Sequence, residues 1–154
     1  MRDDRKRKRG LAEDAVRILE ARGYEAMTEF LAAASAGRPA PEDCAAYVRP
    51  SFVYLAFFGV DGQARYLKIG IADNVRVRMS SYRTHCPLPC VRLLTLRLPN
   101  RGDAYALEIA LLASMGDLRL HGEWVAVDGA QAAVSALTYA ATNFLGRPVN
   151  FAEA

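Results

Sequence analysis

The sequence predicts an α/β (α+β) domain in which three strands alternate with helices. Two apolar runs, residues 53–58 and 66–72, flank the turn Asp61-Gly62. An Asp-Gly pair between two such runs is a strong hairpin signal, because glycine accepts the positive φ of a tight turn. A third apolar run, residues 91–98, follows two prolines. At 154 residues and 52% apolar composition, the chain suffices for one domain with a core, or for one domain with a helical appendage.

The first ten residues carry concentrated positive charge. They hold six Lys or Arg against two Asp, with no apolar residue after Met1, which predicts a basic disordered arm over residues 1–10. Lys6 and Lys8 are therefore candidates for contacts with nucleic-acid phosphates. The alternative is a tail that only keeps the chain in solution.

Residues 11–50 are predicted to form a helical appendage and a linker. Residues 11–22 and 25–35 have apolar residues at helical spacing, Gly23 separates them, and prolines end the second helix. The sequence of this segment identifies no partner. We expect it to contact another protein or a second copy of the chain.

Residues 51–128 are predicted to be the functional domain, with residues 129–154 as a C-terminal helix packed on it. Each helix of this part follows an Asp or Asn that can accept hydrogen bonds from the first turn. The predicted helices are residues 75–83 after Asp73 or Asn74, residues 104–115 after Asp103, and residues 129–145 after Asp128.

Composition also bears on location and partners. No apolar run reaches the ~18 residues of a membrane span, and the N-terminus lacks the apolar region of a signal peptide, so a cytoplasmic location is expected. The three cysteines, an odd number, are expected to be reduced thiols. Basic excess lies in the first ten residues and in the central domain, where a polyanion would dock.

Five short motifs of the central domain occur in a characteristic order: Val53-Tyr54-Leu55, Lys68-Ile69-Gly70, Arg78, Glu108 and Gly122-Glu123-Trp124. In this order and spacing the chain resembles the GIY-YIG endonuclease superfamily, and most closely its phage and bacterial variant, which reads KIG instead of YIG and closes with GEW. The resemblance implies a small three-stranded, mainly antiparallel sheet flanked by helices. It also implies one divalent metal ion, Mg²⁺ or Mn²⁺, and hydrolysis of phosphodiester bonds in DNA, with double-stranded DNA as the expected substrate.

The resemblance implies roles for five residues. Tyr54 matches the tyrosine of the first motif, and Lys68 stands where the second tyrosine usually stands. Arg78 matches the arginine on the following helix, and Tyr82 a position that often carries His or Tyr in nuclease members. Glu108 matches the glutamate that binds the metal.

The chain departs from this pattern at two positions. Leu112 stands where the variant commonly has a histidine, four residues after the glutamate, and Val125 replaces the usual Phe after GEW. The first departure leaves fewer ligands for the metal.

The residue types suit phosphodiester cleavage on chemical grounds as well. The reaction needs a deprotonated nucleophile, a cation on the non-bridging oxygens and a proton source for the leaving alkoxide. Arg78 suits a phosphate because its planar fork donates bidentately, and one carboxylate with phosphate oxygens and waters is adequate for Mg²⁺. Tyr54 or Tyr82 would serve as the base if the metal and Lys68 lowered its pKa. Further nucleic-acid contacts are expected from Arg76, Arg83 and His85.

Each candidate also has an ordinary structural interpretation: core tyrosines at Tyr54 and Tyr82, a solvated strand lysine at Lys68, a loop histidine at His85 and a core anchor at Trp124. The leading functional hypothesis is a metal-dependent DNA endonuclease or nickase. The alternative is a catalytically degenerate nucleic-acid-binding module with the same fold, and a third is a protein-interaction domain. The endonuclease hypothesis expects the five catalytic candidates to converge on one concave surface that solvent reaches.

Overall fold

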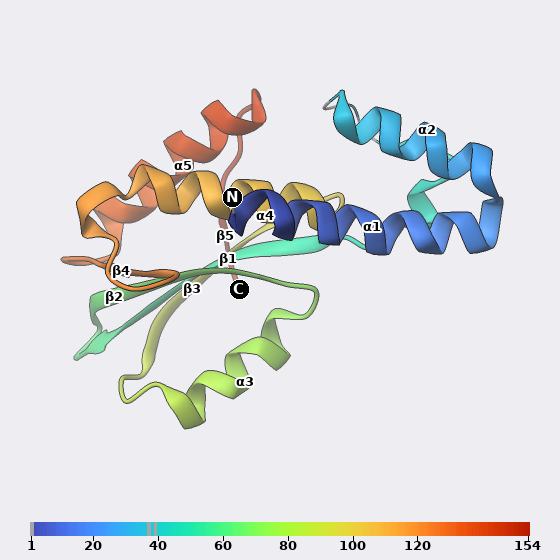
Figure 1. Cartoon of the computed structure of the whole chain (residues 1–154). Coiled ribbons are helices and arrows are strands. Elements are labelled where there is room, and N and C mark those ends of the chain that lie inside the picture. Colours follow the sequence, from blue (N-terminus) through green and yellow to red (C-terminus); the bar gives the residue numbers. More distant parts are fainter. Residues whose placement is uncertain (1, 37, 39) are drawn as a thin grey trace. The chain divides into compact units, whose positions relative to one another are not determined.

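The computed structural model describes residues 2–36, 38 and 40–154, without the side chains of residues 2–4, 6 and 7, so the predicted phosphate contact of Lys6 lies outside the described residues. The chain forms two compact units, Met1–Ser51 with Leu98–Ala106, and Phe52–Arg97 with Leu107–Ala154 (Figure 1). The sequence did not indicate that residues 98–106 pack with the N-terminal segment. None of the described helices is long and apolar enough to cross a membrane.

The N-terminal unit contains the helices α1 (Arg2–Arg22) and α2 (Tyr24–Ser35) and the short 3-10 helix η1 (Ala45–Tyr47). Gly23, between α1 and α2, has a φ of 92°, a value that favours glycine. The helices pack through an apolar cluster in which Ile18 and Phe30 are almost completely buried. The unit therefore has a small core of its own.

Residues 2–10 form the first half of α1, so the expectation of a disordered arm is wrong. Lys and Arg are good helix formers. Residues 2–10 continue directly into an amphipathic helix, so they lengthen an existing helix and do not need to nucleate a new one. Arg9 Nε lies 3.6 Å from a carboxylate oxygen of Glu13, one turn later. The side chains of Arg5, Lys8 and Arg9 are exposed, so α1 presents these charges at fixed helical spacing.

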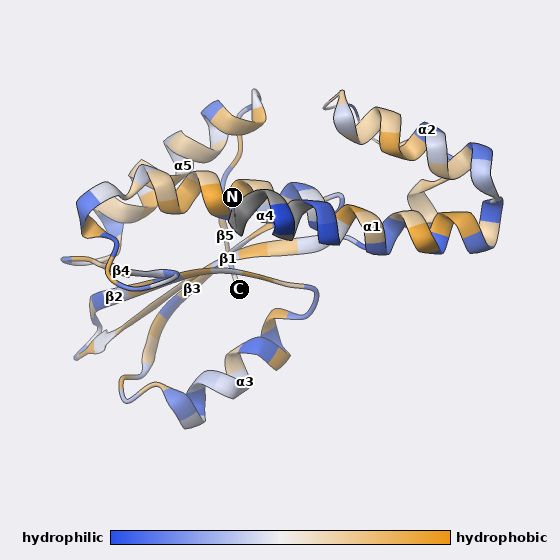
Figure 2. Ribbon diagram, in the orientation of Figure 1, coloured by the Kyte–Doolittle hydropathy of each residue, from blue (hydrophilic) through white to orange (hydrophobic). Residues whose placement is uncertain are grey.

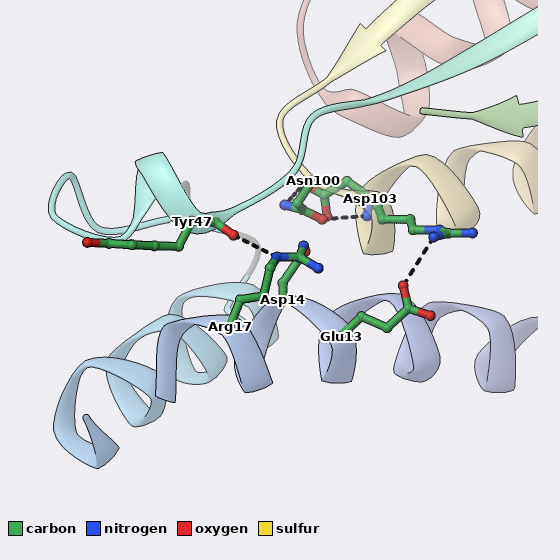
Figure 3. A network of polar contacts seen from close by, with 7 residues as sticks. Glu13, Asp14, Arg17, Tyr47, Asn100 and Asp103 are labelled. Atoms are coloured by element: carbon green, nitrogen blue, oxygen red, sulfur yellow. Dashed lines mark hydrogen bonds and ion pairs between the residues drawn. The ribbon is translucent and has the colours of Figure 1, made fainter. Parts of the chain in front are cut away.

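A network of polar contacts connects α1 to other parts of the same unit (Figure 3). Arg17 forms an ion pair with Asp14, and its Nε donates to the carbonyl oxygen of Tyr47 at 3.1 Å. Arg101 Nη1 lies 3.1 Å from Glu13 Oε2. These contacts hold η1 and the start of the next helix against α1.

That helix, α4 (Arg101–Ser114), begins earlier than predicted because Asn100 rather than Asp103 caps it. Asn100 Oδ1 accepts a hydrogen bond from the backbone N–H of Asp103 at 2.8 Å, and its Nδ2 donates to the Asp103 carboxylate at 2.9 Å (Figure 3). Asparagine and aspartate are about equally good caps, so the sequence alone did not separate them.

The second unit is built on a sheet that, over the described residues, has five strands in the order β4-β2-β1-β3-β5. β2 pairs antiparallel with β1 and β4, and β5 pairs antiparallel with β3. The predicted three-stranded sheet is therefore wrong, although the α+β class is right. The two extra strands are too short to show the alternation by which strands are recognised. The bounds are β1 (Ser51–Val60), β2 (Gln63–Ala72), β3 (Cys90–Leu98), β4 (Trp124–Ala126) and β5 (Ala152–Glu153).

The predicted hairpin between β1 and β2 is confirmed. Asp61 and Gly62 have φ values of 52° and 75°, and two central residues with positive φ give the turn whose twist matches that of the flanking strands. The register places Tyr54 opposite Gly70 and Ala56 opposite Lys68. Residues of the first two motifs therefore face each other across the hairpin.

Helices cover both sides of this sheet (Figure 1). α3 (Val75–His85) lies on one side, and α5 (Gln131–Leu145) lies on the other, together with the part of α4 that begins at Leu107. The 3-10 helix η2 (Gly116–Leu118) follows α4. In Figure 2 α3 is coloured mainly blue and white, and none of its residues is fully buried. It is thus a polar helix laid over an apolar sheet.

Candidate functional site

Four aromatic side chains meet on the side of the sheet that α3 covers. Tyr54 and Phe58 come from β1, Tyr82 from α3 and Trp124 from β4. Tyr54 is 1% exposed, and its Oη lies 2.8 Å from Tyr82 Oη. The Phe58 ring centroid is 5.8 Å from that of Tyr82 and 5.5 Å from that of Trp124. We call these four residues the aromatic cluster, and it joins β1, β4 and α3.

Gly70, the glycine of the second motif, makes room for Tyr54. The two residues are paired across β1 and β2, and a Cβ added at Gly70 would overlap the hydroxyl end of the Tyr54 ring. Only glycine therefore leaves space for the tyrosine at this place. The sequence shows that the motif contains a glycine, but only the register of the strands shows that this glycine lies opposite the Tyr54 ring.

Replacing Gly70 with alanine is expected to lower the free energy of unfolding by about 1–3 kcal/mol, because the new methyl group collides with a ring that is packed on all sides. Combining it with Tyr54→Leu, which removes the part of the ring that the methyl meets, should lose less than the sum of the two single substitutions. Urea denaturation of the four proteins measures this coupling. Strictly additive losses would show that Gly70 and Tyr54 do not constrain each other.

Burial raises the pKa of Tyr54 far above the ordinary value of a tyrosine, and the hydrogen bond with Tyr82 raises it further. The guanidinium of Arg78 acts in the opposite direction but is the weaker influence. These influences oppose the lowered pKa that Tyr54 would need to act as a base, so a lowering of its pKa by a bound metal ion stays a prediction. The hydroxyls of Tyr54 and Tyr82 share one hydrogen bond, which either of them can donate.

Lys68 is held in place beside the aromatic cluster. Its Nζ lies 2.5 Å from Glu123 Oε2 and 5.6 Å from the centroid of the Trp124 ring. Its side chain is 13% exposed, against 29% for Glu123. Lys68 is therefore not an ordinary solvated strand lysine, since an ion pair and an aromatic face fix its charge at one point.

Glu123 and Trp124 belong to the site although sequence reasoning gave neither a role there. Their signal was present, because both belong to the Gly-Glu-Trp motif. β4 pairs Trp124 with Lys68, which brings the Gly-Glu-Trp motif to the Lys68-Ile69-Gly70 motif, and Glu123 contacts Lys68 across 55 residues of sequence. Motif order cannot show such a contact; the strand pairing does.

α3 presents positive charge to solvent. Arg76, Arg78, Arg83 and His85 are exposed, and the chain has no Asp or Glu anywhere between residues 74 and 102. Within the described part of the chain, none of the three arginines forms an ion pair. The helix begins at a cap in which Asn74 Oδ1 accepts from the Val77 N–H at 3.2 Å. These arginines are thus available to an anionic partner.

The structure brings four of the five catalytic candidates to the α3 side of the sheet. Tyr54 and Tyr82 touch there, Lys68 lies against the same cluster, and the charge of Arg78 reaches Tyr54. Glu108 is the exception. It is 2% exposed in α4, whose second part lies on the other side of the sheet (Figure 1). The predicted convergence of all five on one solvent-reachable surface is therefore wrong for Glu108.

The helical register explains this placement. Leu107 and Leu111 are completely buried, and Glu108 follows the first of them on the same inward stripe. Leu112, where the resembling variant commonly has histidine, is also buried, at 3% exposure. Within the described residues there is no group of three or more His, Cys, Asp or Glu arranged to hold a metal ion.

Comparison with protein-family models matches residues 51–138 to the T5orf172 domain, which is found in phage-type and other endonuclease-like proteins. No curated protein and no solved structure matches the chain. The matched segment is more than half of the chain and contains the aromatic cluster, Lys68, the arginines of α3, Glu108 and Glu123.

Proposed function

The chain belongs to the T5orf172 domain family, and from this premise we propose that it is a DNA endonuclease or nickase of the GIY-YIG type that binds the scissile phosphodiester on its α3 side. The observation that carries the proposal is the 2.8 Å contact between the hydroxyls of Tyr54 and Tyr82, with Arg78 one turn before Tyr82 on α3. Residues at i and i+4 share a helix face, so the guanidinium and the Tyr82 hydroxyl address one phosphate. The family by itself supports a nuclease-like or DNA-binding module; the type of nuclease is our proposal.

Each of the four residues on the α3 side has its own proposed role in hydrolysis. Arg78 donates to two oxygens of the phosphate and stabilises the charge that develops on them. Lys68 adds a second positive charge. It is already paired with Glu123, so the phosphate must compete with this carboxylate for the lysine. Tyr82 is the proposed base: once its own proton has passed to solvent, its phenolate oxygen, which accepts a hydrogen bond from Tyr54, takes a proton from the attacking water, and a solvent water protonates the leaving alkoxide.

Mg²⁺ or Mn²⁺ is the proposed cofactor, and Glu108 is the residue that would hold it. The donor chemistry fits, because one carboxylate with phosphate oxygens and waters is enough for Mg²⁺, and such an ion would neutralise charge on the phosphate. The 2% exposure of Glu108 sets a condition. Glu108 lies on α4, on the side of the sheet opposite α3, so it can bind a metal ion at a phosphate held by Arg78 only if this part of the fold rearranges when DNA binds.

Cleavage of supercoiled plasmid tests the proposal. Purified protein with Mg²⁺ or Mn²⁺ should convert the plasmid to the nicked or linear form, and EDTA should stop the reaction. Tyr82→Phe keeps the packed ring and removes the hydroxyl, so it is expected to lose cleavage with only a modest loss of thermal stability, because the buried Tyr54 hydroxyl loses its partner. A wild-type protein that binds plasmid but cuts it with neither metal would contradict the proposed activity.

The second candidate is a binding module that has kept the fold without turnover. The burial of Glu108 and the presence of Leu112 favour it, because a binder needs the arginines of α3 and no metal carboxylate. Under this alternative, plasmid would be shifted in a gel and never cut, and Arg78→Ala would weaken binding.

The exposed cations of α1 are expected to add non-specific affinity for double-stranded DNA. Replacing Arg5, Lys8 and Arg9 with glutamine, a good helix former, should reduce the slope of log K against log salt by about 2–3, because each lost phosphate contact removes about 0.9 from it. Fluorescence anisotropy at several salt concentrations measures the slope, and far-ultraviolet circular dichroism checks the helix. An unchanged slope would show that α1 does not touch DNA.

A further inference from the structure

A pocket of about 610 Å³ lies beside the aromatic cluster, and the proposed hydrolysis does not use it. It is formed by α3, by the loop over residues 86–89, and by parts of β1 and β3. Tyr82 belongs both to the aromatic cluster and to the pocket wall. The lining includes Phe58, Met79, Tyr82, Arg83, Leu88 and Leu93.

We propose that this pocket receives one unpaired DNA base, stacked on Tyr82, from a strand whose phosphates lie along α3. This inference rests on the proposed function in one respect, since it takes the α3 side as the side that binds DNA. It goes beyond that function by assigning a second subsite and a class of substrate: DNA with a base outside the duplex stack.

The pocket has a mainly apolar lining, which suits a base, and arginines beside it, which suit the phosphates of a nucleotide. Apart from Arg83, the lining consists of aromatic, aliphatic and cysteine side chains and prolines, and it includes Tyr82, an aromatic residue of the type on which any base can stack. The rim carries Arg83, and Arg76 and Arg78 lie on the same helix, with no carboxylate between residues 74 and 102. An apolar ligand with a phosphate on either side complements this arrangement, whereas an apolar peptide would leave the arginines unused.

The wall opposite α3 is fixed before any ligand arrives. Pro87 and Pro89 restrict the backbone of the loop, and they end α3 because a proline cannot continue it. The loop is tied at both ends: the Cys86 N–H donates to the Tyr82 carbonyl at 2.8 Å, and the Gly59 N–H donates to the Pro89 carbonyl at 3.1 Å. Little conformational entropy is therefore lost when the pocket fills.

A base in an intact duplex is not accessible to such a pocket, because it must first leave the stack. The cost of extrusion is smallest for a mismatched, bulged or single-stranded base. The pocket therefore predicts a preference for DNA with an unpaired base over a fully paired duplex of the same length and charge.

The experiment uses the full chain and two 20-bp duplexes that differ at one position. One carries a single bulged 2-aminopurine, whose fluorescence responds to stacking, and the other carries an abasic residue in the same bulge. Because both have the same phosphates, contacts of α3 with the backbone cancel in the comparison. The wild type is expected to bind the base-containing duplex about 5- to 150-fold more tightly, the range for stacking of one base on an aromatic side chain.

Leu88→Trp fills the pocket from its loop and leaves Tyr82 and Arg78 in place. It is expected to reduce the ratio of the two affinities to nearly 1 without changing the affinity for the abasic duplex. The matched control is Leu118→Trp, which fills a different pocket of about 520 Å³ lined by Met115 and residues 126–129. That control should keep the wild-type ratio and the wild-type change in 2-aminopurine fluorescence.

Equal affinities of the wild type for the two duplexes would overturn the inference, and so would an equal loss of the ratio in both tryptophan variants. The binding experiment and the plasmid-cleavage assay test the pocket and the proposed activity separately. Base-dependent binding without plasmid cleavage removes the endonuclease proposal and keeps the pocket, whereas cleavage without base dependence does the reverse. Failure to bind any of these DNAs removes both.

Discussion

Arg78→Ala is expected to lower the rate of plasmid cleavage by about 10²–10³-fold, the usual loss when one donor to a transition-state oxyanion is removed. The affinity for DNA should fall much less, because the other cations of α3 remain. Arg78 is exposed and in no ion pair with a described residue, so its loss should not disturb the fold. Single-turnover cleavage and anisotropy measured on the same preparation separate the two effects.

Arg76 provides the matched control for this prediction. It lies on α3 two residues before Arg78, is also exposed, and points to a different face of the helix. Arg76→Ala should weaken binding modestly and leave the cleavage rate of bound DNA within about threefold, as for a phosphate contact that only positions the backbone. Equal losses in cleavage from both substitutions would show that α3 is a general basic surface rather than half of a catalytic site.

Arg78→Lys refines the same argument. Lysine keeps the charge and loses the planar fork that donates to two oxygens at once. If bidentate donation matters, the lysine variant should retain DNA affinity and still lose most of the cleavage rate. Full activity in this variant would mean that only the charge of Arg78 contributes.

Sequence reasoning succeeded where the signal is local. The hairpin followed from Asp61-Gly62, and the class of the fold followed from the alternation of apolar runs with helical periodicity. It failed for residues 2–10, where the composition favours disorder but the continuation into α1 favours helix. Short strands such as β5 contain too few residues for any pattern to be recognised.

The candidate site shows the same division. Tyr54, Lys68, Arg78 and Tyr82 could be listed from motifs, and strand register together with helical spacing brings them to one side of the sheet. The pairing of Lys68 with Glu123 depends on where β4 joins the sheet, which no local pattern encodes. Likewise, the resemblance identifies Glu108 as a candidate, but only the packing of α4 shows that its side chain is buried.

Glu108→Gln is the substitution that separates an endonuclease from a binding module. Glutamine keeps the shape of the side chain and removes the charge that would hold Mg²⁺. If the proposed activity is right, cleavage should fall by about 10²-fold or more, while DNA affinity holds. Because Glu108 is buried and engaged with other residues, the melting temperature must be measured alongside, so that a lost fold is not mistaken for a lost metal.

Glu123→Gln supplies the comparison, because Glu123 is the carboxylate that the structure places beside Lys68 on the α3 side. We expect it to cost less than Glu108→Gln, since it removes a partner of Lys68 and no metal ligand. The reverse order, with Glu108→Gln cutting normally at a lowered melting temperature, would make Glu108 a core residue. It would also move the role of metal carboxylate to Glu123, which already lies beside Lys68 on the α3 side. If the wild type and both variants bind equally and none cuts with Mg²⁺ or Mn²⁺, the chain is a binding module with a nuclease fold.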